Sequence, residues 1–249
     1  MAIEHNYKIL LISADFNNDS IENCFGAQES NNEIVKSLIR KPQINLDSGI
    51  NGLLKLTNSN RVTPDIIHDY TKIVFKNRLE VLYSPMNIDE SINAELMEKF
   101  KNIILNASKY YDYVIVDLKK GMKCSQQLEI LQISDVIVLN INQKIKTIKN
   151  VLEINEIKNL MNKTIWNICN YDSKSKYNTK NLRRTVLKRE AIYETPYNTL
   201  LLEATQEGKI AELLIRFKTL KNEEDNSQFI LKIEELIQGI LTKYQETRS

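Results

Sequence analysis

Five short apolar runs, separated by stretches with helical spacing, constrain the fold more than any other feature of the sequence. The runs are YKILLIS at 7–13, RLEVLYS at 78–84, YVIVDL at 113–118, DVIVLNI at 135–141 and TIWNICN at 164–170. Between them, segments 91–109 and 145–161 repeat apolar residues with the period of an amphipathic helix. Strands that alternate with helices in this way predict an α/β fold, with a mostly parallel sheet and helices on both faces.

The composition agrees with one regular, helix-rich domain. The chain has 249 residues, of which 42% are hydrophobic, so a substantial core can form and we expect residues 1–249 to be a single domain. Six glycines and four prolines are few for this length, which disfavours a turn-rich β-sandwich and a disordered chain.

The last helical segment, 228–244, carries an apolar stripe opposite Lys and Glu residues. Its stripe consists of Phe229, Ile230, Ile233, Leu236, Ile237 and Ile240. Such a stripe is compatible with a helix that lies on a membrane surface or with one that packs on the edge of the sheet. Packing on the sheet is the favoured interpretation, because most amphipathic helices bury their stripe in this way.

A local basic stretch contrasts with the near-neutral chain, whose net charge is +2. Within 172–189, no acidic residue follows Asp172, and seven cations do: Lys174, Lys176, Lys180, Arg183, Arg184, Lys188 and Arg189. This pattern is typical of a solvated helix face, and it also suits weak, sequence-independent contact with the DNA backbone. Both interpretations stay open.

Cysteine usage and hydropathy bear on the cellular setting. Cys24, Cys124 and Cys169 lie far apart, and with only two histidines in the chain they argue against a zinc site or a disulfide framework. No apolar run approaches the ~20 residues that span a bilayer, and the first residues lack a signal-peptide pattern. We therefore expect a cytoplasmic protein with no stable membrane insertion.

Two carboxylates follow strand-like runs: Asp15 after LLISA and Asp117 in YDYVIVDLKKG. Ligands of open parallel sheets bind at the carboxyl ends of the strands, where a carboxylate can hold Mg²⁺ through water or orient an attacking water. Either residue can also be an ordinary acid at the end of a strand. Function is favoured for Asp117, because a carboxylate that closes a fully apolar strand is costly without a partner.

Several segments, in chain order, resemble the MinD/ParA group of deviant-Walker ATPases. YKILLISADFNNDSIENCFG is similar to the group's second strand, YDYVIVDLKKG to its Walker B strand, and LQISDVIVLNINQ to the strand after that. Residues 49–83 follow the group's pattern of a Gly-Leu segment, a short helix and a strand. NICNYDSKSK resembles the strand whose Asn contacts adenine in the group. TPYNTLLLEATQEGKIAELL resembles the stretch that completes the base pocket. NYDSKSK is most similar to the CpaE/TadZ-like pilus-assembly and polar-localisation branch.

The resemblance implies a P-loop NTPase fold that binds ATP and Mg²⁺. It implies that Asp117 holds the metal through water and that Asp15 faces the γ-phosphate or the attacking water. Asn170 would contact adenine, and the backbone near Pro196 would close the base pocket. The resemblance further implies a protein partner or a homodimer.

The sequence also departs from the family pattern. No phosphate loop of the GKGGxGKT type occurs in the 249 residues. In the family this loop would lie before the position of Met1. Relative to the family, we therefore expect a degenerate Walker A motif and an N-terminally incomplete domain. Ser13 stands where the family often has an Asp, and Lys119 and Lys120 follow the Walker B Asp. These lysines form a solvent-facing turn or supply positive charge to the phosphate site.

The missing strand is internal to the family's sheet, so its loss predicts unpaired backbone groups on its neighbours. A sequence that begins late and a degenerate paralogue with a substitute strand are both compatible with this pattern. We expect a positioning or pilus-assembly protein, inactive as an ATPase without an upstream phosphate loop. A DNA-partition protein that uses 174–189 and a nucleotide-free scaffold are the alternatives.

Overall fold

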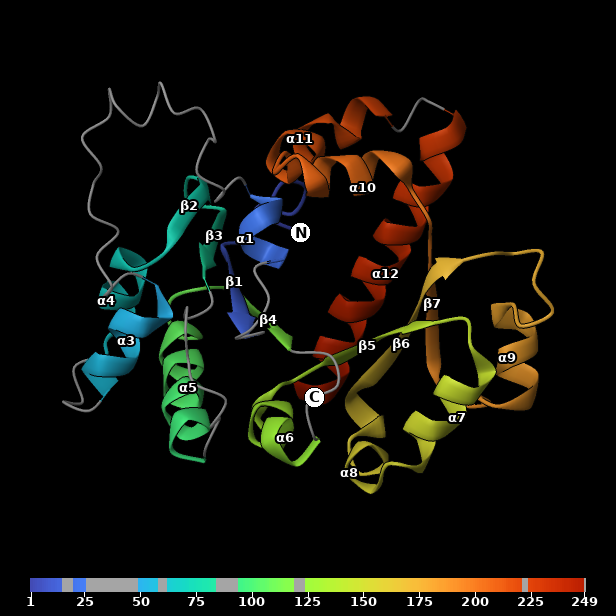
Figure 1. Cartoon of the computed structure of the whole chain (residues 1–249), viewed down its shortest axis with the longest axis horizontal. Helices are drawn as coiled ribbons and strands as arrows, with labels where there is room; N and C mark the ends of the chain where they lie inside the picture. Colours follow the sequence, from blue (N-terminus) through green and yellow to red (C-terminus); the bar gives the residue numbers. More distant parts are fainter. Residues whose placement is uncertain are drawn as a thin grey trace. The chain divides into compact units, whose positions relative to one another are not determined.

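The computed structural model describes residues 1–14, 20–25, 49–57, 62–83, 94–118, 124–220 and 224–248. The chain divides into two compact units (Figure 1). Unit 1 comprises Met1–Glu129 and Leu201–Ile215, and unit 2 comprises Ile130–Leu200 and Arg216–Ser249. Each unit is an α/β structure with its own sheet, and the single-domain organisation expected from the sequence stays a prediction.

Unit 1 contains a four-stranded sheet in the order β2-β3-β1-β4. Its strands are β1 (Ile9–Ala14), β2 (Lys72–Phe75), β3 (Leu79–Leu82) and β4 (Tyr113–Leu118). β1 pairs in parallel with β3 and β4, while β2 runs antiparallel to β3. The predicted runs at 7–13, 78–84 and 113–118 are therefore confirmed as parallel strands, and β2 was not anticipated.

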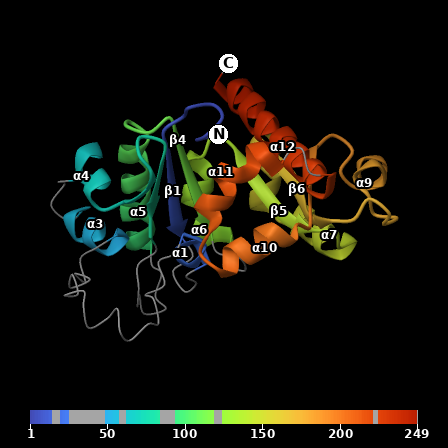
Figure 2. The same cartoon turned by 90° about the horizontal axis from the view of Figure 1, so that it is seen from above.

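The helices of unit 1 include α1 (Ser20–Cys24), α3 (Ile50–Thr57), α4 (Pro64–Asp69) and α5 (Ala94–Ala107). Figures 1 and 2 show α3, α4 and α5 gathered on one side of β1. α5 confirms the helix expected within 91–109, and it buries Met97, Phe100, Ile103 and Ala107. α6 (Cys124–Ile133), α10 (Thr199–Gln206) and α11 (Ile210–Leu220) each contribute residues to both units.

A buried carboxylate lies inside unit 1, on β3. Glu80 is 1% exposed and accepts hydrogen bonds from Thr71 Oγ1 at 2.8 Å, from Tyr111 Oη, and from the His68 ring, whose Nδ1 is 2.8 Å away. Burial alone would raise the pKa of Glu80, but the hydrogen bonds from Tyr111, His68 and Thr71 outweigh burial and hold the pKa below its usual value. These contacts tie α4 and the start of β4 to β3.

Unit 2 contains three parallel strands in the order β5-β6-β7: β5 (Ile137–Asn142), β6 (Thr164–Tyr171) and β7 (Ala191–Pro196). Alternate side chains of these strands point to opposite faces. One face carries Trp166, Ile168 and Ile192, which join Ile148, Leu182 and Leu187 in a core cluster. β5 and β6 match the predicted runs, whereas β7 was not predicted as a strand.

Helices cover both faces of this sheet. α7 (Ile145–Glu153) and α9 (Thr179–Thr185) contribute Ile148 and Leu182 to the core cluster. The helix expected over 145–161 is interrupted, because Ile154 is extended (φ −70°, ψ 116°) and separates α7 from α8 (Asn155–Lys158) and a 3-10 turn (Met161–Lys163).

The C-terminal helix α12 (Glu224–Arg248) packs against β7, as the sequence predicted for its apolar stripe. Phe229 and Ile230 are buried, Gly239 lies against the ring of Tyr193, and Lys232 Nζ contacts Glu194 Oε1 at 3.0 Å. Among the described helices, α12 included, none combines the length and apolar character of a membrane span.

Candidate functional site

The candidate site of unit 1 lies at the carboxyl ends of β1 and β4. The β1–β4 register places Ser13 beside Asp117. Ser13 is 1% exposed, whereas Asp117 is exposed at the surface. An exposed carboxylate at the end of a parallel strand has the chemistry that Mg²⁺ prefers, with water able to complete the coordination. The structure thus puts Asp117 where the sequence predicted it.

Helix α1 adds a second carboxylate and a thiol near this position. Glu22 is 9% exposed, and Cys24 is half-buried. Burial raises the pKa of the Cys24 thiol, a hydrogen bond with Thr205 opposes that change, and the negative charges of Glu22 and Asp117 raise the pKa further. The electrostatic influence on Cys24 therefore comes from two carboxylates, and this environment favours a cation over a phosphate.

Tyr83 and Lys72 lie at the same end of the sheet, and sequence reasoning had missed both. The Tyr83 hydroxyl is buried without a hydrogen-bond partner, and burial together with the Glu22 charge raises its pKa to about 12. Lys72 donates a 2.9 Å hydrogen bond to the carbonyl of Phe25, with its Nζ 5.7 Å from the Tyr83 ring centre. Lys72 reaches this end because β2 is antiparallel, and the short run KIVF was the only signal for it.

Three predicted site residues, Asp15, Lys119 and Lys120, lie outside the described residues. Within the part of the chain that the structure describes, no three His, Cys, Asp or Glu side chains are grouped to hold a metal ion. A metal bound at Asp117 would therefore need water or a ligand's oxygens to complete its shell.

The predicted adenine-contacting residues belong to unit 2. Asn170 is exposed near the end of β6 with φ +50°, and the β6–β7 ladder is irregular between Cys169 and Tyr171. After this irregularity, Tyr171 pairs with Pro196 at the end of β7. The structure thus brings Asn170 and Pro196 to adjacent strand ends. At such a bulge, a left-handed backbone conformation changes the direction in which the side chain points. Asn adopts this conformation more readily than most residues.

A polar network not anticipated from the sequence crosses the same sheet. Asn167 is 4% exposed, donates to Asn140 Oδ1 at 2.8 Å and accepts from Thr195 Oγ1 at 2.9 Å. The sequence TIWNICN did indicate such a network, because a buried Asn inside an apolar strand requires hydrogen-bond partners on the neighbouring strands. Cys169 lies two residues further on, and burial raises the pKa of its thiol.

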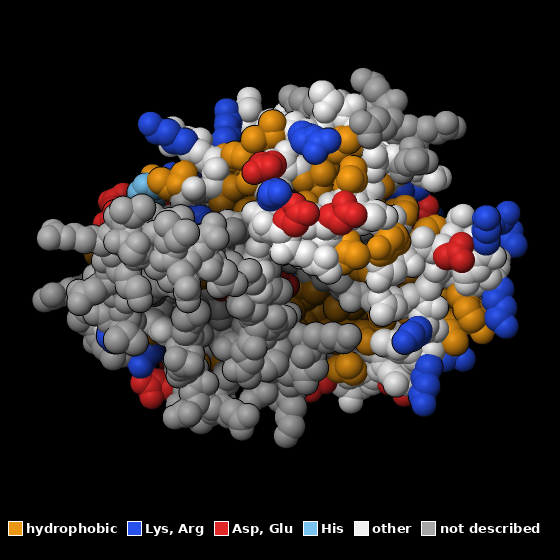
Figure 3. Space-filling model, turned by 45° about the horizontal axis from the view of Figure 1, so that its top comes forward, with side chains coloured by type: hydrophobic (Ala, Val, Ile, Leu, Met, Phe, Trp, Pro, Cys, Tyr) orange, Lys and Arg blue, Asp and Glu red, His pale blue; other side chains and the backbone are white. Residues whose placement is uncertain are grey.

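The basic stretch forms an exposed surface on and around α9. All seven cations from Lys174 to Arg189 are exposed, although Arg183 also donates a 2.9 Å hydrogen bond to the carbonyl of Ile192. Figure 3 shows Lys and Arg side chains at the right-hand end of the view, where Figure 1 places α9.

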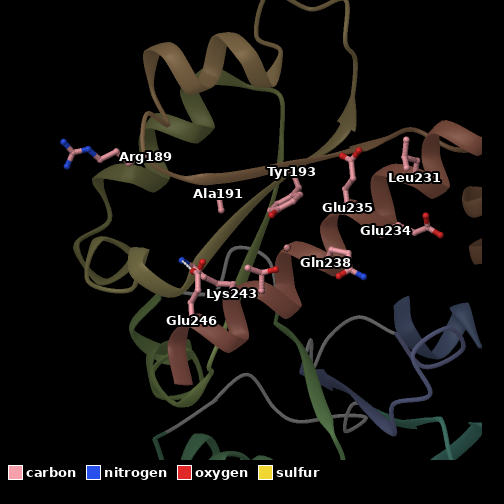
Figure 4. Close-up of a pocket in the computed structure, with 11 residues that line it drawn as sticks. Arg189, Ala191, Tyr193, Leu231, Glu234, Glu235, Gln238, Lys243 and Glu246 are labelled. Atoms are coloured by element: carbon pink, nitrogen blue, oxygen red, sulfur yellow. Dashed lines mark hydrogen bonds and ion pairs between the residues drawn. The ribbon is translucent and has the colours of Figure 1, made fainter. Parts of the chain in front are cut away.

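A groove of about 640 Å³ lies between β7 and α12, and Figure 4 shows Tyr193 pointing from β7 toward the helix. Charges of both signs surround it, including Arg189 and Lys243 as well as Glu234 and Glu235. None of the predicted site residues lines this groove.

No protein-family model matches the sequence, and no curated protein matches it either. Solved structures do match. A ParA family ATPase from Chlorobium tepidum TLS has a TM-score of 0.65 at 14% identity, covering 92% of this chain and 86% of its own. A putative plasmid partition protein from Borrelia burgdorferi B31, bound to AMPPNP, has a TM-score of 0.60 at 18% identity, covering 96% and 88%.

The septum site-determining protein MinD from Pyrococcus horikoshii OT3, complexed with Mg-ADP, has a TM-score of 0.59 at 15% identity, covering 93% of this chain and 83% of its own. At these identities the likeness establishes the fold. The chain therefore has the α/β fold of ParA and MinD ATPases, with mostly parallel strands flanked by helices, as its sequence predicted.

Proposed function

We propose that this chain is a nucleotide-dependent switch of the ParA/MinD type that acts in intracellular positioning or in pilus or secretion assembly. The observation that carries the proposal is Asp117, exposed at the end of a parallel strand and in register with the buried Ser13. The shared fold supports the class of protein. The pattern NYDSKSK after β6 supports the CpaE/TadZ-like branch within it.

In this proposal each site residue has a separate task. Asp117 holds Mg²⁺ through water, and Asp15 orients the water or faces the γ-phosphate. Asn170 and the backbone at Pro196 bind adenine, and Lys119 and Lys120 add positive charge near the phosphates. Bound Mg²⁺ would supply charge neutralisation for the phosphates. A protein partner or a second copy of the chain recognises the nucleotide-bound form.

The 249 residues by themselves are proposed not to hydrolyse ATP. Phosphoryl transfer depends mainly on positive charge and backbone N–H groups around the phosphates, and the sequence has no Gly-rich loop to supply them. Near the carboxyl ends of the unit 1 strands, the negative charges of Glu22 and Asp117 outweigh the positive charge of Lys72, whose ammonium group already contacts the carbonyl of Phe25. This excess of negative charge disfavours the binding of a triphosphate whose own charge is not neutralised.

An ATPase assay on the 249-residue chain tests this directly. We expect no phosphate release above background, and the same result for Asp117→Ala and for the control Asp65→Ala on the exposed side of α4. Turnover that Asp117→Ala abolishes and Asp65→Ala preserves would overturn the proposed inactivity. It would also assign the phosphate-binding role to lysines such as Lys72, Lys119 or Lys120.

The base pocket can be tested separately, in a version of the chain to which a phosphate-loop strand has been added. We expect calorimetry to show ATP binding with little binding of GTP. Asn170→Ala should weaken ATP binding by about 1–3 kcal/mol, because the base loses a paired amide. Equal affinity for ATP and GTP would remove the adenine pocket from the proposal.

DNA partition is the second candidate function, and the exposure of all seven cations between Lys174 and Arg189 favours it. Fluorescence anisotropy should show weak, sequence-independent binding to duplex DNA that falls steeply with salt. Arg184→Glu should weaken it, and Lys158→Glu, an exposed cation outside this stretch, should not. Tight sequence-selective binding would place partition first, whereas neither DNA nor nucleotide binding would indicate a scaffold.

A further inference from the structure

His68 of α4 is held by a buried carboxylate at one ring nitrogen and reaches the surface with the rest of its ring. Its Nδ1 lies 2.8 Å from Glu80 Oε2. The side chain of His68 is 37% exposed, whereas that of Glu80 is 1% exposed. Because the Nδ1 edge is turned toward Glu80, the exposed surface belongs mainly to the opposite part of the ring, which carries Nε2. The proposed nucleotide chemistry uses neither residue.

The contact with Glu80 determines which nitrogen of His68 carries the proton. The pKa of Glu80 is held below its usual value, so the carboxylate is ionised at neutral pH and can only accept hydrogen bonds. The Nδ1 of His68 therefore donates to it, and in the neutral imidazole Nε2 keeps its lone pair. Within the described residues, Nε2 has no hydrogen-bond partner. A lone pair that is fixed in direction and not hydrogen-bonded is the requirement for a nucleophile.

Neighbouring residues hold the backbone of His68 and place a cation near its ring. The Thr71 N–H donates to the His68 carbonyl at 3.2 Å, and the Thr71 hydroxyl lies 2.9 Å from that carbonyl and 2.8 Å from Glu80 Oε2. The centre of the Tyr110 ring is 6.2 Å from that of the imidazole and 3.2 Å from the ammonium of Lys8. The Lys8 charge thus lies within about 10 Å of His68, the Debye length in 0.1 M salt, and can attract an anion there.

We propose that His68 is a site of phosphorylation at Nε2, with a compound of the phosphoramidate class as the phosphoryl donor. The Nε2 lone pair forms a bond to phosphorus while the P–N bond of the donor breaks, and ammonia leaves with the electron pair of that bond. Nε2 carries no proton, so none has to be removed. The positive charge that the ring acquires is stabilised by Glu80 through Nδ1–H, which makes Glu80 a positioning residue. The local charge is mixed, since Asp65 and Asp69 of α4 are also exposed, so orientation of the lone pair is the main contribution.

Treatment of the full chain with phosphoramidate tests both the residue and the nitrogen. His5 is the internal control, because it is the other histidine of the chain. Its ring stacks on that of Tyr7, with centres 5.9 Å apart, and no hydrogen bond joins it to a carboxylate in the described part of the structure. We expect ³¹P NMR and peptide mass spectrometry to show His68 phosphorylated at Nε2 about tenfold faster than His5. In concentrated urea the two rates should become similar, because Glu80 then orients neither ring.

The role of Glu80 is tested by a variant and, without any substitution, by the tautomer of His68. Glu80→Gln should slow phosphorylation of His68 about tenfold, whereas the exposed control Glu95→Gln should leave it unchanged. Long-range ¹H–¹⁵N NMR of the unmodified chain should show a neutral ring with its proton on Nδ1. A proton on Nε2, or a ring protonated on both nitrogens at about pH 8, would overturn the proposal. Equal rates for His68 and His5 in the folded chain, or phosphorylation of His68 at Nδ1, would overturn it as well.

Discussion

Glu80 shows how a single residue can link three segments of unit 1. Its carboxylate lies on β3 and accepts hydrogen bonds from His68 in α4, from Thr71 after α4 and from Tyr111 before β4. A buried charge is tolerated only when such partners compensate its lost hydration.

We expect Glu80→Gln to lower the free energy of unfolding by about 2–4 kcal/mol at pH 7, because three donors lose a charged acceptor. The folded pKa lies below the unfolded value of 4.5, so the unfolded state binds the proton more readily. The charge-dependent part of this stabilisation is therefore present above about pH 4.5 and is lost as the pH falls through the folded pKa. Urea titrations between pH 7 and pH 3 measure it.

The control is Glu95→Gln on α5, where the carboxylate is exposed and pairs with Lys99. This substitution should leave the free energy of unfolding almost unchanged, because an exposed ion pair contributes little to stability. The difference in unfolding free energy between Glu80→Gln and the unmodified chain should shrink as the solution is acidified. If it stays constant, the stabilisation by these hydrogen bonds does not depend on the charge of Glu80.

Individual site residues were predictable in position but not in conformation. Hydrophobic runs locate strand ends, so Asp117 and Asn170 could be placed from the sequence. The left-handed backbone of Asn170 could not, because it depends on how Tyr171 pairs with Pro196 on β7. Likewise, Lys72 reaches the strand ends only because β2 is antiparallel.

At the scale of elements, the apolar runs predicted β1, β3, β4, β5 and β6, while β2 and β7, each at one end of its sheet, escaped. β2 has only four residues, and β7 is interrupted by Glu194 and ends in Pro196. Such strands gain their conformation from pairing rather than from their own hydrophobic pattern. The break at Ile154 was missed for a related reason, since apolar residues continue at helical spacing across it.

The packing of α12 on β7 depends on a residue without a side chain. A Cβ at Gly239 would lie 2.1 Å from Cζ of Tyr193. In an exposed helix, Gly→Ala would stabilise by about 1 kcal/mol. Here we expect Gly239→Ala to destabilise by about 1–3 kcal/mol instead, because the Tyr193 ring has to move. Denaturant unfolding measures the sign of this change in the free energy of unfolding.

The neighbouring Gln238→Ala provides the control, since Gln238 is exposed and its substitution should have an effect of about 0.5 kcal/mol or less. Combining Gly239→Ala with Tyr193→Ala should remove most of the penalty due to the glycine change. A stabilised Gly239→Ala protein would show that α12 does not press on Tyr193.

At the scale of the whole molecule, the two units have separate cores, and the chain's only tryptophan lies in one of them. Trp166 is fully buried in the core of unit 2. Phe100→Ala, in unit 1, should cost about 3–5 kcal/mol. We expect it to lower the unfolding midpoint seen by circular dichroism while the Trp166 fluorescence midpoint stays in place. Leu182→Ala in unit 2 should shift the fluorescence midpoint.

Coincident shifts of both signals in Phe100→Ala would mean that the units unfold as one cooperative domain. That result would support the single domain expected from the sequence, despite the two sheets. Independent shifts would establish two folding units within one chain.

The order of the segments has a consequence for synthesis. Unit 1 is completed by Leu201–Ile215, which the ribosome makes only after residues 130–200 of unit 2. A nascent chain released at residue 129 would hold the four described strands of unit 1 but lack α10 and α11, including Thr205, which hydrogen-bonds to Cys24. We therefore expect unit 1 to complete its folding during translation only after Leu201–Ile215 has been made, when most of unit 2 has also been synthesised.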